Sequence, residues 1–154
     1  MATKRIGFIS FRVAGTDGVS LETGKWAAVL EQMGSQCYFM AGELDTPADR
    51  SFLEEKLNCQ HPDIRAVFEE SFGSSRRSPG LTSKIHDLRQ VLKVRIYEFI
   101  RKFNLDLLIA QNTLALPLNI PLGLALTEVI AETGMPVIAH HHDFFWERKR
   151  FLRN

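Results

Sequence analysis

The sequence predicts an α/β fold in which a parallel sheet is covered by helices on both faces. The main indication is a series of short, continuously apolar runs, which are typical of strands buried on both sides. Segments with apolar residues at intervals of three and four lie between several of these runs and predict helices. Polar residues and glycines follow the runs, as expected where strands turn into loops.

The chain is expected to begin with a strand, a helix and a second strand. Arg5–Phe11 is the first apolar run, and the loop Arg12–Gly18 after it contains two glycines, which permit a tight turn. Ser20 is the expected N-cap of the helix, and Gln36–Ala41 is the second apolar run. The buried face of the helix is expected to comprise residues at helical spacing: Trp26, Val29, Leu30 and Met33.

The segment from Thr46 to Gly80 carries a weaker pattern. A short helix is expected around Phe52–Leu57 and a further element near Ile64–Phe72. Glycine, serine and proline dominate Gly73–Gly80, a composition that predicts a flexible loop.

A long helix is expected next, capped by Thr82 or Ser83 and ending near Phe103. Its apolar positions recur at intervals of three and four: Ile85, Leu88, Leu92, Ile96, Phe99 and Phe103. The apolar run Leu105–Ala110 predicts the following strand.

The C-terminal part is expected to add one more helix and one more buried strand. Asn119 is placed as the N-cap of the helix and Gly134 at its end. Met135–Ala139 is the last apolar run, and another helix is expected to start near Phe144.

Composition restricts the functional classes. The chain has 154 residues, 45% hydrophobic and 24% charged, with a formal net charge of +1, so we expect no nucleic-acid partner. Cys37 lies in an apolar run and is expected in the core, whereas Cys59 lies in a polar stretch, so no disulfide framework is indicated. No apolar run approaches the ~20 residues of a membrane helix. We therefore expect a cytoplasmic protein, with peripheral membrane contact left open.

The residues that follow the expected strands carry most of the chemical groups. If the sheet is parallel, its strands end at one edge, where ligands bind in open α/β sheets. Four groups would then meet there: Arg12–Gly18, Gly42–Asp45, Gln111–Asn112 and His140–Asp143.

The glycine loop could bind an anion. Gly15 and Gly18 precede a helix, whose N–H groups and dipole favour phosphate. The spacing is neither Gly-x-Gly-x-x-Gly nor a P-loop, so no dinucleotide or triphosphate is assigned. A plain strand-to-helix turn is the alternative.

The histidines after the last expected strand allow three interpretations. Because side chains alternate in extended chain, His140 and His142 should share one side and His141 the other. His140 and His142 could be half of a metal site. A polar catalytic or binding cluster that includes Asp143 is favoured over the metal site. The third interpretation is a structural role at the strand end.

Two segments together resemble glycosyltransferase family 4. One is the glycine loop with the helix Glu22–Leu30, and the other is Ala139–Phe144, with three histidines and Asp143 before the aromatic residue. The resemblance covers nearly the whole chain. It implies a GT-B architecture, in which two Rossmann-like domains face each other across a cleft, and a retaining enzyme that needs no metal.

The resemblance also implies roles for individual residues. Residues 1–154 would form the acceptor-side N-terminal domain, incomplete at its C-terminus, and the donor domain would be absent. His142 and Asp143 would be catalytic, and Gly15 and Gly18 would lie near the donor phosphates and the acceptor. The partners implied are a nucleotide-sugar donor, an acceptor and the donor domain, without which this chain should not transfer sugar.

Three other functions remain alternatives. A stand-alone Rossmann-like module could bind a small ligand or regulate another protein. A metal-dependent hydrolase could use His140 and His142. A non-catalytic fragment could pair with a separate donor-domain subunit, and a large exposed apolar face would favour that possibility.

Overall fold

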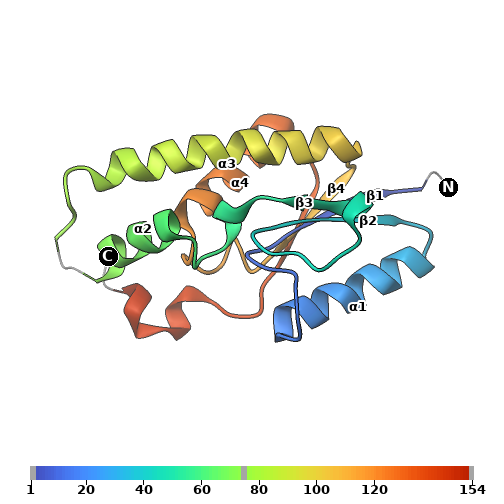
Figure 1. Cartoon of the computed structure of the whole chain (residues 1–154), viewed down its shortest axis with the longest axis horizontal. Helices are drawn as coiled ribbons and strands as arrows, with labels where there is room; N and C mark the ends of the chain where they lie inside the picture. The colour runs from blue at the N-terminus through green and yellow to red at the C-terminus, as the bar shows by residue number, and fades with distance from the viewer. Residues whose placement is uncertain (1–2, 74–75, 153–154) are drawn as a thin grey trace.

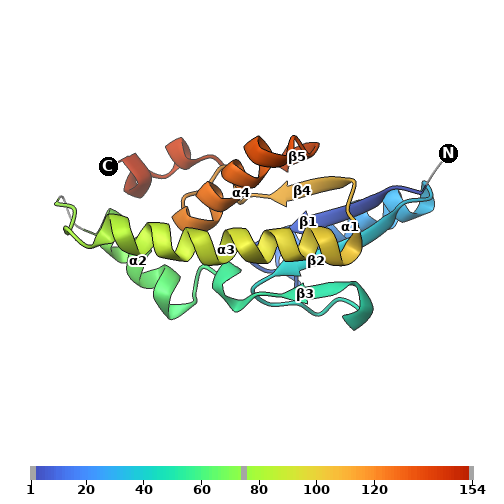
Figure 2. The same cartoon turned by 90° about the horizontal axis from the view of Figure 1, so that it is seen from above.

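The computed structural model describes residues 3–73 and 76–152. In this part of the chain five strands form one sheet in the order β3-β2-β1-β4-β5, and all neighbouring strands are parallel (Figure 2). The strands are β1 Arg5–Ile9, β2 Gln36–Ala41, β3 Ser51–Leu53, β4 Leu107–Gln111 and β5 Val137–His140. The predicted parallel α/β fold is confirmed.

Helices cover both faces of the sheet, as expected. They are α1 Gly18–Gln32, α2 Pro62–Phe72, α3 Leu81–Phe103 and α4 Ile120–Thr133. Helix α1 lies on one face, and α3 and α4 lie together on the other (Figures 1 and 2). Short 3-10 turns complete the described elements: η1 Ala48–Arg50, η2 Glu55–Leu57, η3 Phe145–Glu147 and η4 Lys149–Leu152.

The side chains of the central strand β1 point alternately to the two faces of the sheet, and the core is accordingly divided into two layers. Ile6 and Phe8 of β1 pack with the α1 layer, whereas Ile9 packs with the α3–α4 layer. All three side chains are at most 3% exposed. Burial on both faces explains why the strands read as continuous apolar runs.

The first helix begins earlier than the sequence indicated. Ser20 was expected as its N-cap, but the helix starts at Gly18 and the cap is Asp17, whose carboxylate accepts hydrogen bonds from the Val19 and Ser20 N–H groups. The Ser20 hydroxyl instead donates to Asp17 and accepts from the Ala14 N–H group. Asp17 and Ser20 are both good N-cap residues and lie close in sequence, so the sequence pattern alone does not show which of them caps the helix.

The predicted buried face of α1 is wrong in part. Val29 is 55% exposed and Met33 is 75% exposed. Trp26 and Leu30 pack only at the margin of the core, and the fully buried apolar residue of the helix is Ala27. Helix α1 covers the sheet alone on its face, so only part of its apolar surface meets a partner.

The segment expected to be a short helix around Phe52–Leu57 holds a strand and a turn. Residues Ser51–Leu53 form β3, an edge strand that pairs with β2, and Glu55–Leu57 form η2. A strand of three residues is too short to show a period. The element near Ile64–Phe72 is the helix α2.

The long helix and the last helix match their predictions closely. Every residue expected on the apolar face of α3 is buried. The helix begins at Leu81 after Gly80, so neither Thr82 nor Ser83 caps it. Asn119 caps α4 and Gly134 ends it in a left-handed conformation, as predicted. Residues 74 and 75 of the expected loop Gly73–Gly80 lie outside the described residues.

The last strand differs from its prediction. It was expected to be buried, but β5 is an edge strand whose residue Ile138 is 41% exposed. The helix expected from Phe144 is replaced by the two turns η3 and η4. No helix among the described residues is both long and apolar enough to cross a membrane. The expected cytoplasmic location stays a prediction.

The sheet order places a topological switch point between β1 and β4. From β1 the chain moves outward to β2 and β3, and then returns to the other side of β1 for β4 and β5. At such a switch point the loops after the two central strands leave on opposite faces and open a crevice. The segments after β1 and β4 therefore flank the place where a ligand is expected.

Gly42 provides a test of the packing at this edge, because a Cβ atom there would lie 2.2 Å from the Asn58 backbone nitrogen. Gly42→Ala should lower the free energy of unfolding by about 1–3 kcal/mol, because the backbone must move. Urea unfolding followed by circular dichroism measures this. The control Gly24→Ala, in α1 with nothing within 4 Å of the added atom, should raise stability by about 0.5–1 kcal/mol. If both substitutions changed the free energy of unfolding equally, the close approach of Gly42 to the Asn58 backbone would be contradicted.

Candidate active site at the carboxyl edge of the sheet

The strand-end groups meet at one edge, as predicted from the sequence, and they do so in two pairs. The first pair joins the loops after β1 and β2. Val13 and Leu44 form an isolated parallel bridge, the Gly15 N–H group donates to the Asp45 carboxylate at 2.7 Å, and Arg12 forms an ion pair of 3.1 Å with Glu43. These contacts hold the glycine loop against the end of β2.

The second pair joins the ends of β4 and β5 through Asn112. Its N–H group donates to the His140 carbonyl oxygen at 2.9 Å. Its side-chain oxygen accepts from the His142 N–H group at 3.1 Å and, more weakly, from the Asp143 N–H group at 3.4 Å. One buried amide thus positions the backbone of both residues that were predicted to be catalytic.

Asn112 holds an unusual backbone conformation. Its φ angle is 62°, in the left-handed region, which costs most side chains about 1–2 kcal/mol and which asparagine tolerates best among residues other than glycine. The side chain is 5% exposed. The sequence therefore uses a residue that both accepts this conformation and supplies a hydrogen-bond acceptor.

The His142 ring is fixed by Gln111, the last residue of β4. The His142 Nε2 atom lies 3.1 Å from the Gln111 side-chain oxygen. With the Gln111 amide in this orientation its oxygen can only accept, which assigns the Nε2 proton to the neutral ring and makes Nδ1 the acceptor. His142 is exposed, so Nδ1 can accept a hydrogen bond from a ligand hydroxyl.

Asp143 is held by Arg148 from the turn that follows. The Arg148 guanidinium donates to one carboxylate oxygen of Asp143 at 2.8 Å, and both side chains are about two-fifths exposed. The ion pair limits the rotamers of Asp143 and leaves its second oxygen for another partner. Asp143 and His142 are therefore both oriented by neighbouring residues.

His140 joins this edge to α1. Its ring stacks on Trp26 with centroids 4.6 Å apart and lies 4.5 Å from the His142 ring. The shared side predicted for His140 and His142 is thus confirmed. Burial lowers the pKa of the His140 imidazole, the neighbouring His142 lowers it further, and Glu22 partly opposes this. His140 is accordingly neutral at pH 7.

Several donors of the glycine loop are already occupied within the protein. Gly15 donates to Asp45, and the N–H groups at the start of α1 bind the carboxylate of Asp17. Burial opposes the charge of Asp17, but its hydrogen bonds with Ser20 and the Arg12 guanidinium outweigh burial and lower the pKa of that carboxyl. The role of Gly15 and Gly18 beside donor phosphates stays a prediction.

The metal interpretation finds no ligand set in residues 3–73 and 76–152. No group of three or more histidine, cysteine, aspartate and glutamate side chains there is arranged to hold a metal ion. His140 and His142 lie together, but an imidazole pair alone falls short of the three or four protein ligands of zinc sites. The described chain offers no support for a metal-dependent hydrolase.

Two buried polar atoms near the end of β4 have no partner. They are the side-chain nitrogen of Gln111 and the hydroxyl of Thr113, both in residues at most 2% exposed. Buried donors without partners are rare because each costs about 1–3 kcal/mol. They mark the segment after β4 as a place that a polar ligand could occupy.

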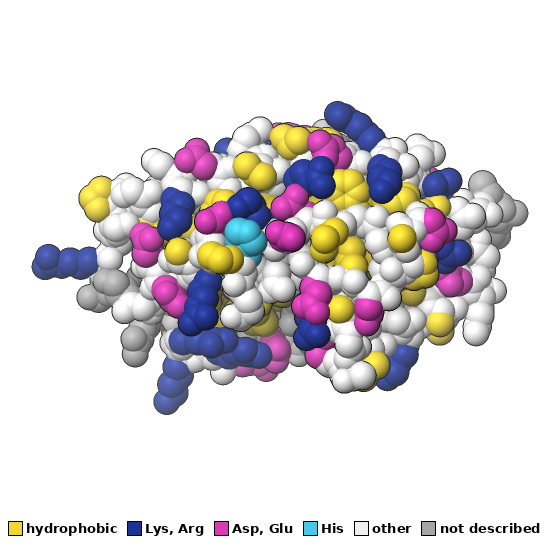
Figure 3. All heavy atoms as spheres, viewed as in Figure 1, with side chains coloured by type: hydrophobic (Ala, Val, Ile, Leu, Met, Phe, Trp, Pro, Cys, Tyr) yellow, Lys and Arg dark blue, Asp and Glu magenta, His cyan; other side chains and the backbone are white. Residues whose placement is uncertain are grey.

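Sequence reasoning placed Gln111 and Asn112 at a strand end but assigned them no role, and it missed Arg148 and Thr113. A polar pair directly after a fully buried strand was the available signal for the two amides. Arg148 lies in a charged segment with Lys149 and Arg150, and no pattern distinguishes it from them. Figure 3 shows acidic and basic side chains interspersed over one face of the molecule.

Comparisons with known proteins add an independent line of evidence. No protein-family model matches the chain. The chain is 30% identical over 155 residues to mannosylglucosylglycerate synthase of Thermotoga maritima, and 29% identical over 154 residues to the protein of the same name from Petrotoga mobilis. The alignments cover 96% and 97% of this chain and 34% of each relative. The chain therefore spans about one third of the length of these curated relatives.

The chain is related to glycosyltransferases. This agrees with the expectation of a glycosyltransferase. The partial coverage of the relatives agrees with an N-terminal part of such an enzyme.

Asn112 variants test how the site is held. Asn112→Ala should lower the free energy of unfolding by about 1–3 kcal/mol, because it loses two hydrogen bonds and keeps a strained φ angle. Asn112→Gly loses the same bonds without the strain and should be destabilised less. Asn112→Asp keeps the acceptor oxygen and should stay closest to the wild type. Chemical unfolding measures the stability of all three variants. If Asn112→Ala and Asn112→Gly lost the same free energy of unfolding, the claim that the left-handed conformation of residue 112 strains an alanine would be wrong.

His140 should make the protein less stable in mild acid. Its folded-state pKa lies below the unfolded value, so the unfolded chain binds the proton first as the pH falls through about 6.5. Stability should therefore fall between pH 7.5 and 5.5, and it should fall less in His140→Gln. Urea unfolding across this range gives the slopes, and NMR titration of the ring reports its pKa directly. A ring pKa above 6.5 would contradict the assignment.

Proposed function

We propose that the chain is the N-terminal, acceptor-side part of a retaining glycosyltransferase of family 4 with GT-B architecture. The observation that carries the proposal is the similarity to two mannosylglucosylglycerate synthases along nearly the whole chain. The confirmed parallel α/β fold and the polar edge beside the β1–β4 switch point support it.

The names of the relatives indicate the reaction class. We propose transfer of a mannosyl group from a nucleotide-sugar donor to a hydroxyl of glucosylglycerate, whose glycerate end carries a carboxylate. In this transfer the bond from the anomeric carbon to the donor phosphate oxygen breaks, and the acceptor hydroxyl oxygen bonds to that carbon. The hydroxyl proton leaves with the nucleoside diphosphate, so charge and atoms balance.

His142 would contact the transferred sugar or the acceptor. Gln111 holds Nε2 of the ring, and the free Nδ1 atom is an acceptor that can orient a sugar hydroxyl. The carboxylate of Asp143, fixed by Arg148, would bind a second hydroxyl. Gly15 and Gly18 would lie beside the donor phosphates. Such positioning can supply a large part of a rate enhancement without a covalent role for the protein.

Donor binding would need a second domain. The relatives are about three times as long as the aligned part, and two domains of ordinary size fit that length. Residues 1–154 would then form one half of the cleft, without activity by themselves. A regulatory module that pairs with a separate donor subunit remains the alternative.

The test is a transfer assay on the polypeptide as its source makes it, after intact mass spectrometry has established its length. The assay supplies nucleoside-diphosphate mannose and glucosylglycerate and detects the product by mass. His142→Ala should lower turnover by at least about 100-fold, in the range of lost positioning or acid–base contributions. Because the ring is exposed, its removal should change the free energy of unfolding by less than about 1 kcal/mol.

The matched control is His86→Ala on α3, an exposed histidine outside the site, which should leave turnover unchanged. If His142→Ala lowered stability as strongly as turnover, the assignment of His142 to the active site would be wrong. A polypeptide of two-domain length that transfers no sugar would contradict the proposed function.

A further inference from the structure

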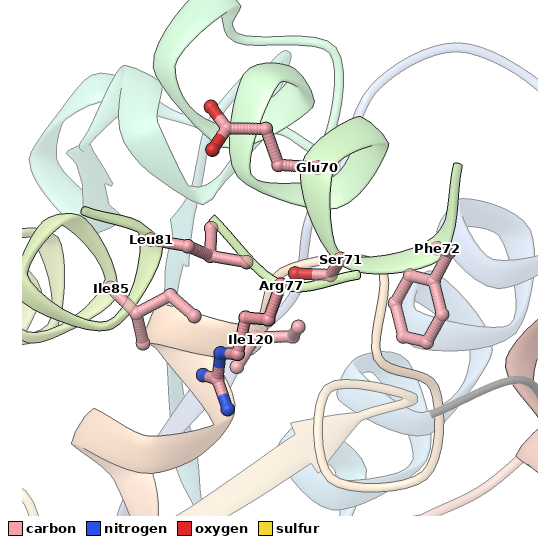
Figure 4. Close-up of a pocket in the computed structure, with 7 residues that line it drawn as sticks. All are labelled: Glu70, Ser71, Phe72, Arg77, Leu81, Ile85 and Ile120. Carbon is pink, nitrogen blue, oxygen red and sulfur yellow. The ribbon is translucent and has the colours of Figure 1, made fainter. Parts of the chain in front are cut away.

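A pocket between α2, α3 and α4 has the features of a binding site for a small acid. Its volume is about 420 Å³, within the range of small-molecule sites. Leu81, Ile85 and Ile120 line it with apolar surface, and Ser71 and Arg77 bring polar groups into it (Figure 4). We call it the Ser71–Arg77 pocket.

Ser71 has an unsatisfied hydroxyl. The residue is 8% exposed, and its hydroxyl oxygen, buried at the end of α2, has no hydrogen-bond partner. Figure 4 shows this oxygen pointing into the pocket. A serine in a helix commonly bonds the carbonyl four residues before it, and Ser71 forgoes this bond. The hydroxyl is therefore available to a ligand.

The charges around the pocket favour an anion. The guanidinium of Arg77 projects between Ile85 and Ile120, whereas the carboxylate of Glu70 turns away (Figure 4). That carboxylate already accepts hydrogen bonds from Ser78 and Lys84. Arg77 is thus the charged group that faces the pocket among its described lining residues.

The start of α3 adds a second attraction for negative charge. Leu81, its first residue, lines the pocket. No side chain caps this helix, and its first turn contains no acidic residue. In α1, by contrast, Asp17 occupies the corresponding donors. No side chain of the described residues therefore occupies the first N–H groups of α3, which can add to the attraction for an anion.

A second hollow lies beside this pocket, on the side of the segment that follows β4. It has a volume of about 400 Å³ and shares Phe72 and Ile120 with the Ser71–Arg77 pocket. Its other lining residues include Thr113, whose hydroxyl is unsatisfied, and Phe145. Thr113 directly follows Asn112, which holds His142 and Asp143. The second hollow therefore extends from the Ser71–Arg77 pocket toward the residue next to Asn112.

We propose that the Ser71–Arg77 pocket binds the carboxylate of the acceptor, a glycosylated hydroxy acid, and thereby turns the sugar end of the acceptor toward His142. This inference rests on the proposed function for the identity of the acceptor. Arg77 supplies the charge and a planar pair of donors suited to a carboxylate. Ser71 supplies one neutral hydrogen bond.

The test measures binding of small probes to the 154-residue chain by NMR titration. D-glycerate should bind at least about 10-fold more tightly than glycerol, its neutral counterpart, because a charged hydrogen bond is worth about 1.5–3 kcal/mol, a factor of 10 or more. Amide signals of Ser71, Leu81 and Ile120 should shift. Equal binding of glycerate and glycerol, or no binding of glycerate, would overturn the proposal.

Variants distinguish binding of glycerate in the pocket from nonspecific attraction of glycerate to positive charge. Arg77→Gln should weaken glycerate binding about 10-fold or more, whereas Arg65→Gln, which removes a matched exposed arginine of α2 that pairs with Glu69, should leave it unchanged. Ser71→Ala should weaken binding about 2- to 10-fold without loss of stability, because the lost hydroxyl had no partner. Equal effects of Arg77→Gln and Arg65→Gln would contradict the proposal.

Inorganic phosphate is the competing anion. If phosphate binds more tightly than glycerate and displaces it, the pocket is a phosphate site and the carboxylate assignment is wrong. The outcome is independent of the transfer assay. Arg77-dependent glycerate binding without sugar transfer would contradict the proposed function alone, and transfer without Arg77-dependent binding would contradict this inference alone.

Discussion

The double-sided burial of β1 is the constraint on which the other elements depend. Its side chains alternate between the α1 layer and the α3–α4 layer, and its backbone pairs in parallel with β2 and β4. Because parallel neighbours need crossover connections, α1 and α3 must pass over opposite faces. The carboxyl ends of the strands consequently lie at one edge, with the switch point between β1 and β4.

The polar side chains at that edge are held in place by a few hydrogen bonds rather than by burial in a deep pocket. Asn112 bonds the backbone on both sides of the last strand end, and Gln111 fixes the ring of His142. Arg148 then holds Asp143 from the C-terminal turns. The two residues with candidate catalytic roles are thus presented on a loop, but they are oriented by Gln111 and Asn112 at the end of β4 and by Arg148.

Exposed apolar side chains lie on several elements, among them α1, β5 and the turn η3. Ile138 of the edge strand and Val29 of α1 are each more than two-fifths exposed, and Trp26 is covered on one side by His140. The same helix buries Ala27 against the sheet. A single helix over five strands covers the centre of its face and leaves the margin toward β5 open.

The sequence by itself determined the fold class, because runs of apolar residues and the helical period of α3 follow directly from which surfaces are buried. It also located His142, Asp143 and the glycine loop at strand ends, since topology alone places them there. Only the tertiary structure decided that Asp17 rather than Ser20 caps α1, that Val29 and Met33 remain exposed, and that Ser51–Leu53 is a strand. Those outcomes depend on which neighbour reaches a given group, and a local pattern does not carry that information. The same holds for Ser71 and Arg77, six residues apart in the chain, whose shared pocket exists only because α3 and α4 pack against α2.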